Sequence, residues 1–167
     1  MAYADELDPA NISTWNGDIS AFRAKGGKLQ TYHGLADPAI SSENSARYYN
    51  HVSETMNLLH TDLDDFYRFY RISGMSHCFG GVGAWEIGQS SSDVPATASH
   101  NILFSLIDWV EKGRAPDTIL GTKYINDTKS LGVRFQRNHC RYPYRNKYIG
   151  GDPNVPSSWN CELYPTL

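Results

Sequence analysis

The feature that most constrains the fold is a strand–helix–strand succession in the first half of the chain. Residues 28–33 are short and β-prone, and residues 66–73 are aromatic and alternating; a glycine follows each segment. Between them, apolar side chains recur at helical spacing over residues 42–58, with a serine available as the N-cap. A helix that connects two strands of one sheet makes them parallel, with a right-handed crossover. The sequence therefore predicts a βαβ unit and an α/β fold.

The remaining elements do not complete a domain of this kind. A second helix is expected over residues 98–112, where four apolar side chains share one face and Gly113 supplies a stop signal. Short strands are expected around 118–125 and 131–137. A single βαβ unit leaves a sheet edge and one helix face uncovered. We therefore expect residues 1–167 to be part of a larger domain, with an entry segment (1–19), a strand–helix–strand–helix core (20–113), and short strands with an irregular tail (114–167).

Composition and charge exclude several classes of protein. A hydrophobic fraction of 40% is too high for a disordered chain, and no apolar run approaches the roughly 18 residues of a membrane span. Fifteen Lys and Arg against 18 Asp and Glu give a formal charge of -3. Such a chain has no basic field for a phosphate backbone, so neither nucleic acid nor a membrane is an expected partner. Residues 1–13 are acidic and lack an apolar stretch, so no signal peptide is expected within this chain.

The cysteines favour an oxidising compartment. Cys140 and Cys161 bracket the turn-rich tail, and a disulfide between them would close a loop of about 20 residues and contribute roughly 3 kcal/mol. The alternative is two free, buried thiols. Cys78 is left over, and either it is a free thiol or its partner lies outside this chain. The acceptor sequons at Asn11 and Asn126 also fit a secreted glycoprotein. We therefore expect an extracellular protein.

Asp37 and His77 stand where a parallel sheet presents its binding rim. Each follows one of the two predicted strands, and ligands of open parallel sheets bind beyond the carboxyl ends of the strands. A carboxylate that accepts the imidazole Nδ1–H fixes the tautomer and stabilises the imidazolium formed in general-base catalysis. One alternative is a turn aspartate beside an unrelated loop histidine. Another is a metal site completed by His33, although His33 is expected within the strand, below the rim.

A triad also needs a nucleophile, and the sequence offers no convincing one. No G-x-S-x-G elbow follows a strand. Ser41, Ser73 and Ser76 lie near the rim without the strand–turn–helix setting that would aim a hydroxyl at His77. Cys78 is adjacent to that histidine, so its side chain points elsewhere. The chain order Ser, Asp, His is that of α/β-hydrolases, which puts the expected serine upstream of this chain.

Several stretches taken together resemble the tannase and feruloyl esterase family of secreted serine esterases. The strongest runs from Phe66 to Gly81 and contains the sequence GMSHCFGG. The sequence YHG at residues 32–34 also fits, as do CRYP at 140–143 and GGDP at 150–153. The resemblance covers nearly all of this chain, but only about the carboxyl-terminal third of a family member.

The resemblance implies a partial α/β-hydrolase fold that contributes the last parallel strands and helices of the sheet. The implied activity is cleavage of feruloyl esters of plant cell-wall polysaccharide or galloyl esters of tannins. The acid and the base of the family's catalytic triad correspond to Asp37 and His77. The resemblance also implies a disulfide between Cys78 and a cysteine immediately before the upstream serine. Ser76 replaces a glycine that is common before the histidine, which puts the loop conformation in doubt but removes no catalytic group.

The implied partners are an aromatic ester and the upstream part of the same enzyme, which carries the serine. Family members also have a lid domain with a structural calcium ion, but that domain lies outside these residues, so no cofactor or metal is expected here. The competing interpretation is a non-catalytic, truncated module that binds phenolics, glycans or a partner chain. The run from Arg141 to Tyr148 could stack sugars or bases, although a solvated surface is the favoured interpretation. Without the serine, the chain alone is expected to be inactive.

Overall fold

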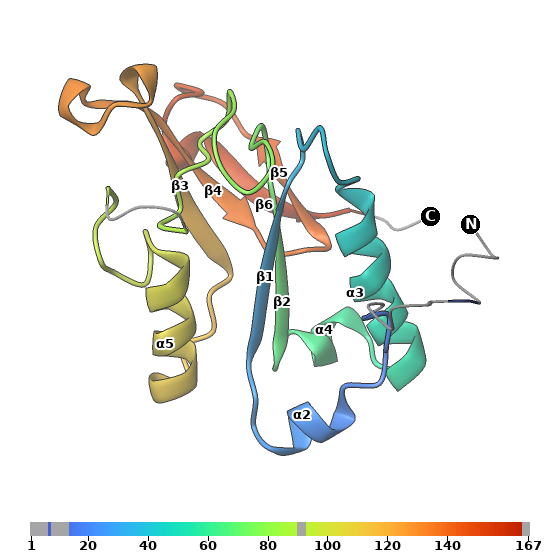
Figure 1. The fold of residues 1–167 in the computed structure, drawn as a ribbon. Helices are drawn as coiled ribbons and strands as arrows, with labels where there is room; N and C mark the ends of the chain where they lie inside the picture. Colours follow the sequence, from blue (N-terminus) through green and yellow to red (C-terminus); the bar gives the residue numbers. More distant parts are fainter. Residues whose placement is uncertain (1–6, 8–13, 90–92, 165–167) are drawn as a thin grey trace.

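The centre of the molecule is a parallel strand pair with helices on both sides (Figure 1). The computed structural model describes residues 7, 14–89 and 93–164. Strand β1 (Leu29–Gly34) pairs in parallel with β2 (Tyr67–Ile72). Leu29 lies opposite Tyr67, and Gly34 lies opposite Ile72. Helix α3 (Glu43–Met56) connects the two strands, which confirms the predicted strand–helix–strand unit. The shorter helices α2 (Ser20–Ala24) and α4 (His60–Leu63) precede β1 and β2.

Strand β2 is buried because its alternate side chains enter two separate cores. Tyr67 and Phe69 pack against Tyr49 and Val52 of α3, with the Tyr49 and Tyr67 ring centroids 5.0 Å apart. Burying each such side chain contributes roughly 1.5 to 3 kcal/mol. On the other side of the strand, a second core contains Tyr70, Ile72, Met75, Ile87 and Ile119. Burial on both faces is typical of a strand inside a parallel sheet, and it explains the apolar character of the segment.

Helix α5 (Ile102–Lys112) begins later than the predicted residue 98 because of its N-cap. The side chain of Asn101 accepts hydrogen bonds from the backbone N–H groups of Leu103 and Phe104. The helix ends at Gly113, whose φ of 68° is left-handed, as the stop signal predicted. Its inner face consists of Ser105, Asp108 and Trp109, whereas much of the predicted apolar face is exposed: Leu103 (58%), Ile107 (38%) and Val110 (60%).

The carboxyl-terminal third is more regular than predicted. Strands β3 (Thr118–Tyr124) and β4 (Val133–Cys140) pair in antiparallel fashion, close to the predicted ranges. The expectation of an irregular tail is wrong, because β5 (Tyr144–Tyr148) and β6 (Trp159–Leu163) form a second antiparallel pair. Both strands are short and neither has a buried residue, so the alternation of Trp159, Cys161 and Leu163 in β6 does not mark a strand that faces a core. Short 3-10 turns occupy Ile125–Asp127, Lys129–Leu131 and Pro156–Ser158.

The disulfide between Cys140 and Cys161 is present, which confirms the sequence prediction and ties β4 to β6. We expect replacement of both residues by alanine to lower the free energy of unfolding of this chain by about 3 kcal/mol, since the bridge closes a loop with a sequence separation of 21. Urea unfolding at pH 7 measures the loss. Cys78→Ala is the matched control, because Cys78 is free and exposed. A double variant no less stable than this control would contradict the prediction.

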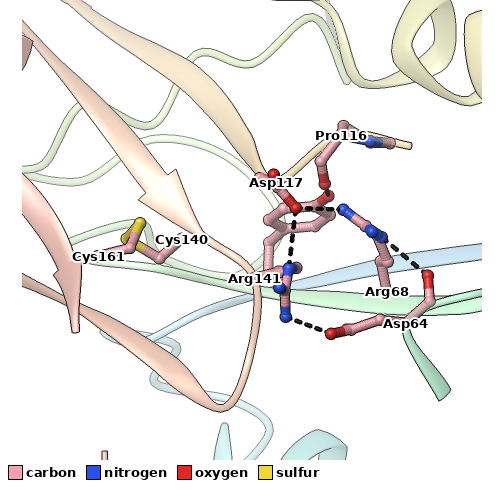
Figure 2. A network of polar contacts seen from close by, with 8 residues as sticks. Asp64, Arg68, Pro116, Asp117, Cys140, Arg141 and Cys161 are labelled. Carbon is pink, nitrogen blue, oxygen red and sulfur yellow. Dashed lines mark hydrogen bonds and ion pairs between the residues drawn. A yellow bond between two sulfur atoms is a disulfide. The ribbon is translucent and has the colours of Figure 1, made fainter. Parts of the chain in front are cut away.

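An ion-pair network joins β2 to the turn after β4 (Figure 2). The Arg141 guanidinium donates to the carboxylate of Asp64 and, through Nε at 3.0 Å, to that of Asp117. Arg68 donates from Nη1 to the same Asp117 oxygen at 2.8 Å and from Nε to the Asp64 carbonyl at 3.0 Å. Nearby, the Tyr70 hydroxyl donates to the carbonyl of Pro116. The turn is therefore fixed to the central strand by charge as well as by packing.

The interpretation of residues 141–148 as a solvated surface is wrong for the first three residues of the run, of which Tyr142 and Pro143 are buried. Arg141 lies in this network, and Tyr142 is 8% exposed and belongs to the α3 core. Arg145 and Lys147 further along are exposed, as expected. The Tyr142 backbone N–H donates to the Phe69 carbonyl at 2.7 Å, which places the start of the run beside β2.

Among the described residues, no helix is long and apolar enough to cross a lipid bilayer.

Candidate active site

The two loops that follow β1 and β2 meet at one end of the strand pair (Figure 1). Gly34 ends β1, and a Cβ there would run into the carbonyl groups of Met75 and Ser76. Because glycine has no Cβ, the loops approach closely enough for the Ala36 N–H to donate to the Met75 carbonyl at 2.9 Å. Gly34 thus allows the contact between the loops that carry Asp37 and His77.

The loop that carries His77 is held on both sides of the histidine. Met75 is fully buried, and it forms an isolated antiparallel bridge with Gly81. The Ser76 N–H donates to the Gly80 carbonyl at 3.1 Å, and Lys123 of β3 donates from Nζ to the Gly81 carbonyl at 2.6 Å. The histidine therefore projects from a turn that is held by hydrogen bonds on both sides, one of them from Ser76.

Asp37 and His77 form a hydrogen-bonded pair, as their positions after the two strands predict. The Asp37 Oδ2 and His77 Nδ1 atoms are 2.8 Å apart. The Asp37 side chain is 2% exposed, whereas that of His77 is 54% exposed. A carboxylate only accepts hydrogen bonds, so the network assigns the proton of this bond to Nδ1. This leaves Nε2, on the accessible side chain, as the nitrogen that can take a proton from a reacting group.

The Asp37 carboxylate is stabilised in its ionised form by four donors. Burial by itself would raise the pKa of this group. The backbone N–H groups of Ile40 and Ala39 oppose this effect by donating to Oδ1 at 2.9 and 2.8 Å. Hydrogen bonds from His77 and His33 lower the pKa further, so that it lies well below its ordinary value. Asp37 is thus a permanent negative charge beside His77 at neutral pH.

His33 lies within β1, as predicted, but it also reaches the Asp37 carboxylate. Its Nε2 is 3.1 Å from Asp37 Oδ2, and its Nδ1 is 2.7 Å from Ser45 Oγ. The three residues of the suggested metal site are thus together, but as hydrogen-bond partners around one carboxylate. Among residues 7, 14–89 and 93–164, no group of three or more His, Cys, Asp or Glu side chains could hold a metal ion. Sequence reasoning missed the contact between His33 and Asp37, although the four-residue spacing at a strand end was visible.

A cavity of about 150 Å³ opens beside this group. Tyr32, Ile40 and Cys78 line it together with Asp37 and both histidines. Burial raises the pKa of the Tyr32 hydroxyl, and the neighbouring Cys78 thiol adds a smaller effect in the same direction. The volume is below the roughly 300 Å³ at which small-molecule pockets usually begin. The cavity can therefore accept part of a ligand rather than enclose a whole one.

No nucleophile completes the site within the described part of the chain. No serine, threonine or cysteine side chain of residues 7, 14–89 and 93–164 makes a hydrogen bond with His77. Cys78 is exposed, and its φ of 65° is left-handed. In chemical terms, the Asp37–His77 pair can accept a proton and stabilise the resulting imidazolium.

Of the two glycosylation sequons, one lies in the turn after β3 and the other falls outside the described residues. Asn126 is exposed in the turn after β3, and the Thr128 hydroxyl donates to its carbonyl at 3.2 Å. Asn11 falls among residues 8–13, which the structure does not describe. The geometry at Asn126 leaves its side chain accessible for modification.

Comparison with known proteins gives concordant results. The sequence profile described as "Tannase and feruloyl esterase" matches residues 5–162. A probable feruloyl esterase B-1 from Aspergillus flavus is 51% identical over 162 residues, covering 96% of this chain and 31% of the relative. A probable feruloyl esterase B-2 from Aspergillus oryzae matches equally well. The chain thus spans about a third of the length of these curated relatives.

Solved structures give the same result. A crystal structure of an esterase from Aspergillus oryzae matches with a TM-score of 0.91 and 50% identity, covering 96% of this chain and 32% of the other. The crystal structure of feruloyl esterase B from Aspergillus oryzae matches with a TM-score of 0.89 and 46% identity, with the same coverage. A tannin acyl hydrolase from Aspergillus niger shares the fold, with a TM-score of 0.70 at 24% identity. By sequence and by structure, the chain belongs to the tannase and feruloyl esterase family.

Proposed function

We propose that this chain supplies the acid and the base of a serine carboxylic-ester hydrolase. The observation that carries the proposal is the Asp37–His77 pair, with a buried carboxylate 2.8 Å from Nδ1 of an exposed imidazole. That arrangement suits a reaction that passes a proton through Nε2. The serine would come from the upstream part of the same enzyme, which would complete an α/β-hydrolase sheet beyond the edge of β1.

The mechanism is acyl transfer in two halves. The Nε2 atom of His77 removes the proton of the serine hydroxyl as the serine oxygen attacks the ester carbonyl. The imidazolium returns that proton to the departing alcohol, and an acyl-serine remains. Water then attacks this ester, again losing a proton to His77, and the acid product and free serine are released. Asp37 stays ionised throughout and stabilises the imidazolium in each half.

The proposed substrate is an ester of a phenolic acid. The relatives at 46 to 51% identity are described as feruloyl esterases, whereas the tannin acyl hydrolase is 24% identical. This gradient favours feruloyl esters of plant cell-wall polysaccharide over galloyl esters of tannins. The cavity beside His77 would hold only part of such a molecule, so the upstream segment would supply most of the substrate contacts.

Two further features support an extracellular enzyme assembled from both parts. The Cys140–Cys161 disulfide and the exposed sequon at Asn126 suit a secreted glycoprotein. The free, exposed Cys78 adjoins the catalytic base, so a disulfide from it to a cysteine beside the serine would tie the loop of the base to the nucleophile.

The test is hydrolysis of methyl ferulate and methyl gallate, measured with this chain alone and with the chain joined to the upstream segment of its own gene. We expect the joined protein to hydrolyse methyl ferulate in preference to methyl gallate, because the serine and substrate contacts are then present. The chain alone should show no more activity than its His77→Ala variant. Activity of the isolated chain above that variant would mean that a nucleophile exists within these residues. An inactive joined protein would favour a non-catalytic module.

A further inference from the structure

We infer that His33 is a positioning residue for the Asp37–His77 pair, an inference that rests on the proposed function. The Oδ2 atom of Asp37 is shared by two imidazoles, His77 Nδ1 at 2.8 Å and His33 Nε2 at 3.1 Å. Its Oδ1 atom is occupied by the backbone N–H groups of Ala39 and Ile40. His33 is thus the second side chain, besides the reacting histidine, that hydrogen-bonds Oδ2.

The tautomer of His33 follows from its two neighbours. Because ionised Asp37 only accepts hydrogen bonds, the His33 Nε2 atom carries the hydrogen of that contact. In the neutral ring Nδ1 is then an acceptor, and the Ser45 hydroxyl donates to it across 2.7 Å. Ser45 lies in the first turn of α3. The series Ser45, His33, Asp37 and His77 therefore connects α3, β1 and both rim loops through hydrogen bonds between side chains.

Burial makes this connection rigid. The His33 side chain is 12% exposed, and its backbone is held in register with Arg71 of β2. Asp37, in contrast, lies on a loop, where the two backbone donors to Oδ1 form a pivot. Without His33, Oδ2 would keep His77 as its only side-chain partner and could swing about that pivot. A shift of about 1 Å in a catalytic group can cost up to roughly 100-fold in rate.

Three variants separate positioning from simple structural damage. His33→Leu removes the donor to Asp37, whereas His33→Gln places an amide N–H near the position of Nε2. Ser45→Ala leaves the ring in place and removes only the donor that selects its tautomer. His60→Leu is the matched control, because His60 lies in α4, before the start of β2.

In the joined protein, we expect His33→Leu to lower kcat for methyl ferulate by about 10- to 100-fold with KM within twofold. His33→Gln should recover most of this loss, and His60→Leu should show none. In the 167-residue chain, NMR titration of the Asp37 side-chain carboxyl should give a higher pKa in His33→Leu than in wild type or His33→Gln. In Ser45→Ala, the ¹⁵N shifts of the His33 ring should move toward a mixture of tautomers.

The two measurements distinguish failure of this inference from failure of the proposed function. If His77→Ala abolishes hydrolysis while His33→Leu stays within twofold of wild type, with an unchanged Asp37 titration, then His33 does not position the pair and the proposed function stands. If the joined protein retains its activity in His77→Ala, the proposed function is wrong and the role of His33 falls with it. A loss in His33→Leu that His33→Gln fails to recover would show that the ring acts by packing rather than by donating to Asp37.

Discussion

Replacing His77 by alanine is expected to lower kcat for methyl ferulate by on the order of 10⁴- to 10⁶-fold in the protein joined to its upstream segment. In the proposed mechanism, Nε2 takes up the proton of the serine in the first half of the reaction and a proton of water in the second, and no other described side chain occupies that place. KM should change by less than about threefold, because the imidazole acts on the transition state more than on the bound ester. Steady-state kinetics with methyl ferulate measure both parameters.

The substitution Asp37→Asn tests the role of the carboxylate in the same pair. The asparagine keeps the size of the side chain but can present an N–H to His77 in place of a carboxylate oxygen, which favours the wrong imidazole tautomer. We expect a loss of roughly 10⁴-fold in kcat. The double variant with His77→Ala should lose little more than His77→Ala alone, because the two residues act as a unit.

His60→Gln is the matched control for these substitutions. It removes an imidazole at the far end of β2 and should leave kcat within about twofold of wild type. Equal thermal unfolding of wild type and His77→Ala would show that the loss is not a loss of fold, since the His77 side chain is 54% exposed. A His77→Ala protein that retained more than about a tenth of its kcat would rule out His77 as the base.

The placement of Asp37 and His77 at one end of the strand pair could be predicted from sequence, because it follows from the order of the strands and the helix between them. The order of strand, helix and strand determines that the loops carrying Asp37 and His77 leave from the same end of neighbouring parallel strands. The burial of Asp37 and its hydrogen bonds from the backbone N–H groups of Ala39 and Ile40 followed only from the structure.

The β5–β6 pair could not be predicted because its stability is not local. Its strands, YRNKY and WNCEL, have only five residues each, and although Trp159, Cys161 and Leu163 share one face of β6, none of them is buried. They are held by the Cys140–Cys161 disulfide and by ring contacts, including Tyr148 with Trp159 at 5.3 Å between centroids. The guanidinium of Arg137 on β4 lies 3.6 Å from the centre of the Trp159 ring and adds a cation–π contact. These partners come from three strands, and a periodicity within one segment does not reveal them.

The exposed face of α5 shows a different limit of sequence reasoning. The apolar spacing of Leu103, Ile107 and Val110 is a helical signal, and the helix is present. The same spacing indicates a buried face, yet this face is exposed in the described chain. The spacing predicts the helix correctly but not the burial of its face, and the relatives that the chain matches are about three times as long as the chain. The apolar periodicity therefore indicates the helix itself, but it does not indicate whether the apolar face of α5 is buried within this chain.

Replacing Arg141 by methionine is expected to lower the free energy of unfolding of this chain by about 3 to 5 kcal/mol at pH 7. The Asp64 carboxylate is 8% exposed, and one of its oxygens, Oδ1, is buried without a hydrogen-bond partner among the described residues. Its other oxygen accepts from Arg141 (Figure 2). Methionine would fill similar space but leave this charge buried and unpaired. Urea unfolding measures the loss, and the Arg145→Met variant of an exposed arginine is the matched control, expected to change stability by less than about 0.5 kcal/mol.

The pH dependence of this loss identifies Asp64 as its cause. Burial raises the pKa of Asp64, and the charge of Arg141 opposes that effect. Removing Arg141 therefore raises the pKa further, so the folded variant binds a proton at a pH where the unfolded chain does not. The variant then gains stability relative to wild type as the pH falls from 7 toward the ordinary pKa of a carboxyl group. The loss should be smaller at pH 5 than at pH 7, and adding Asp64→Asn should recover part of it at pH 7. An equal loss at both pH values would show that packing of the Arg141 side chain, rather than the unpaired carboxylate, determines the cost.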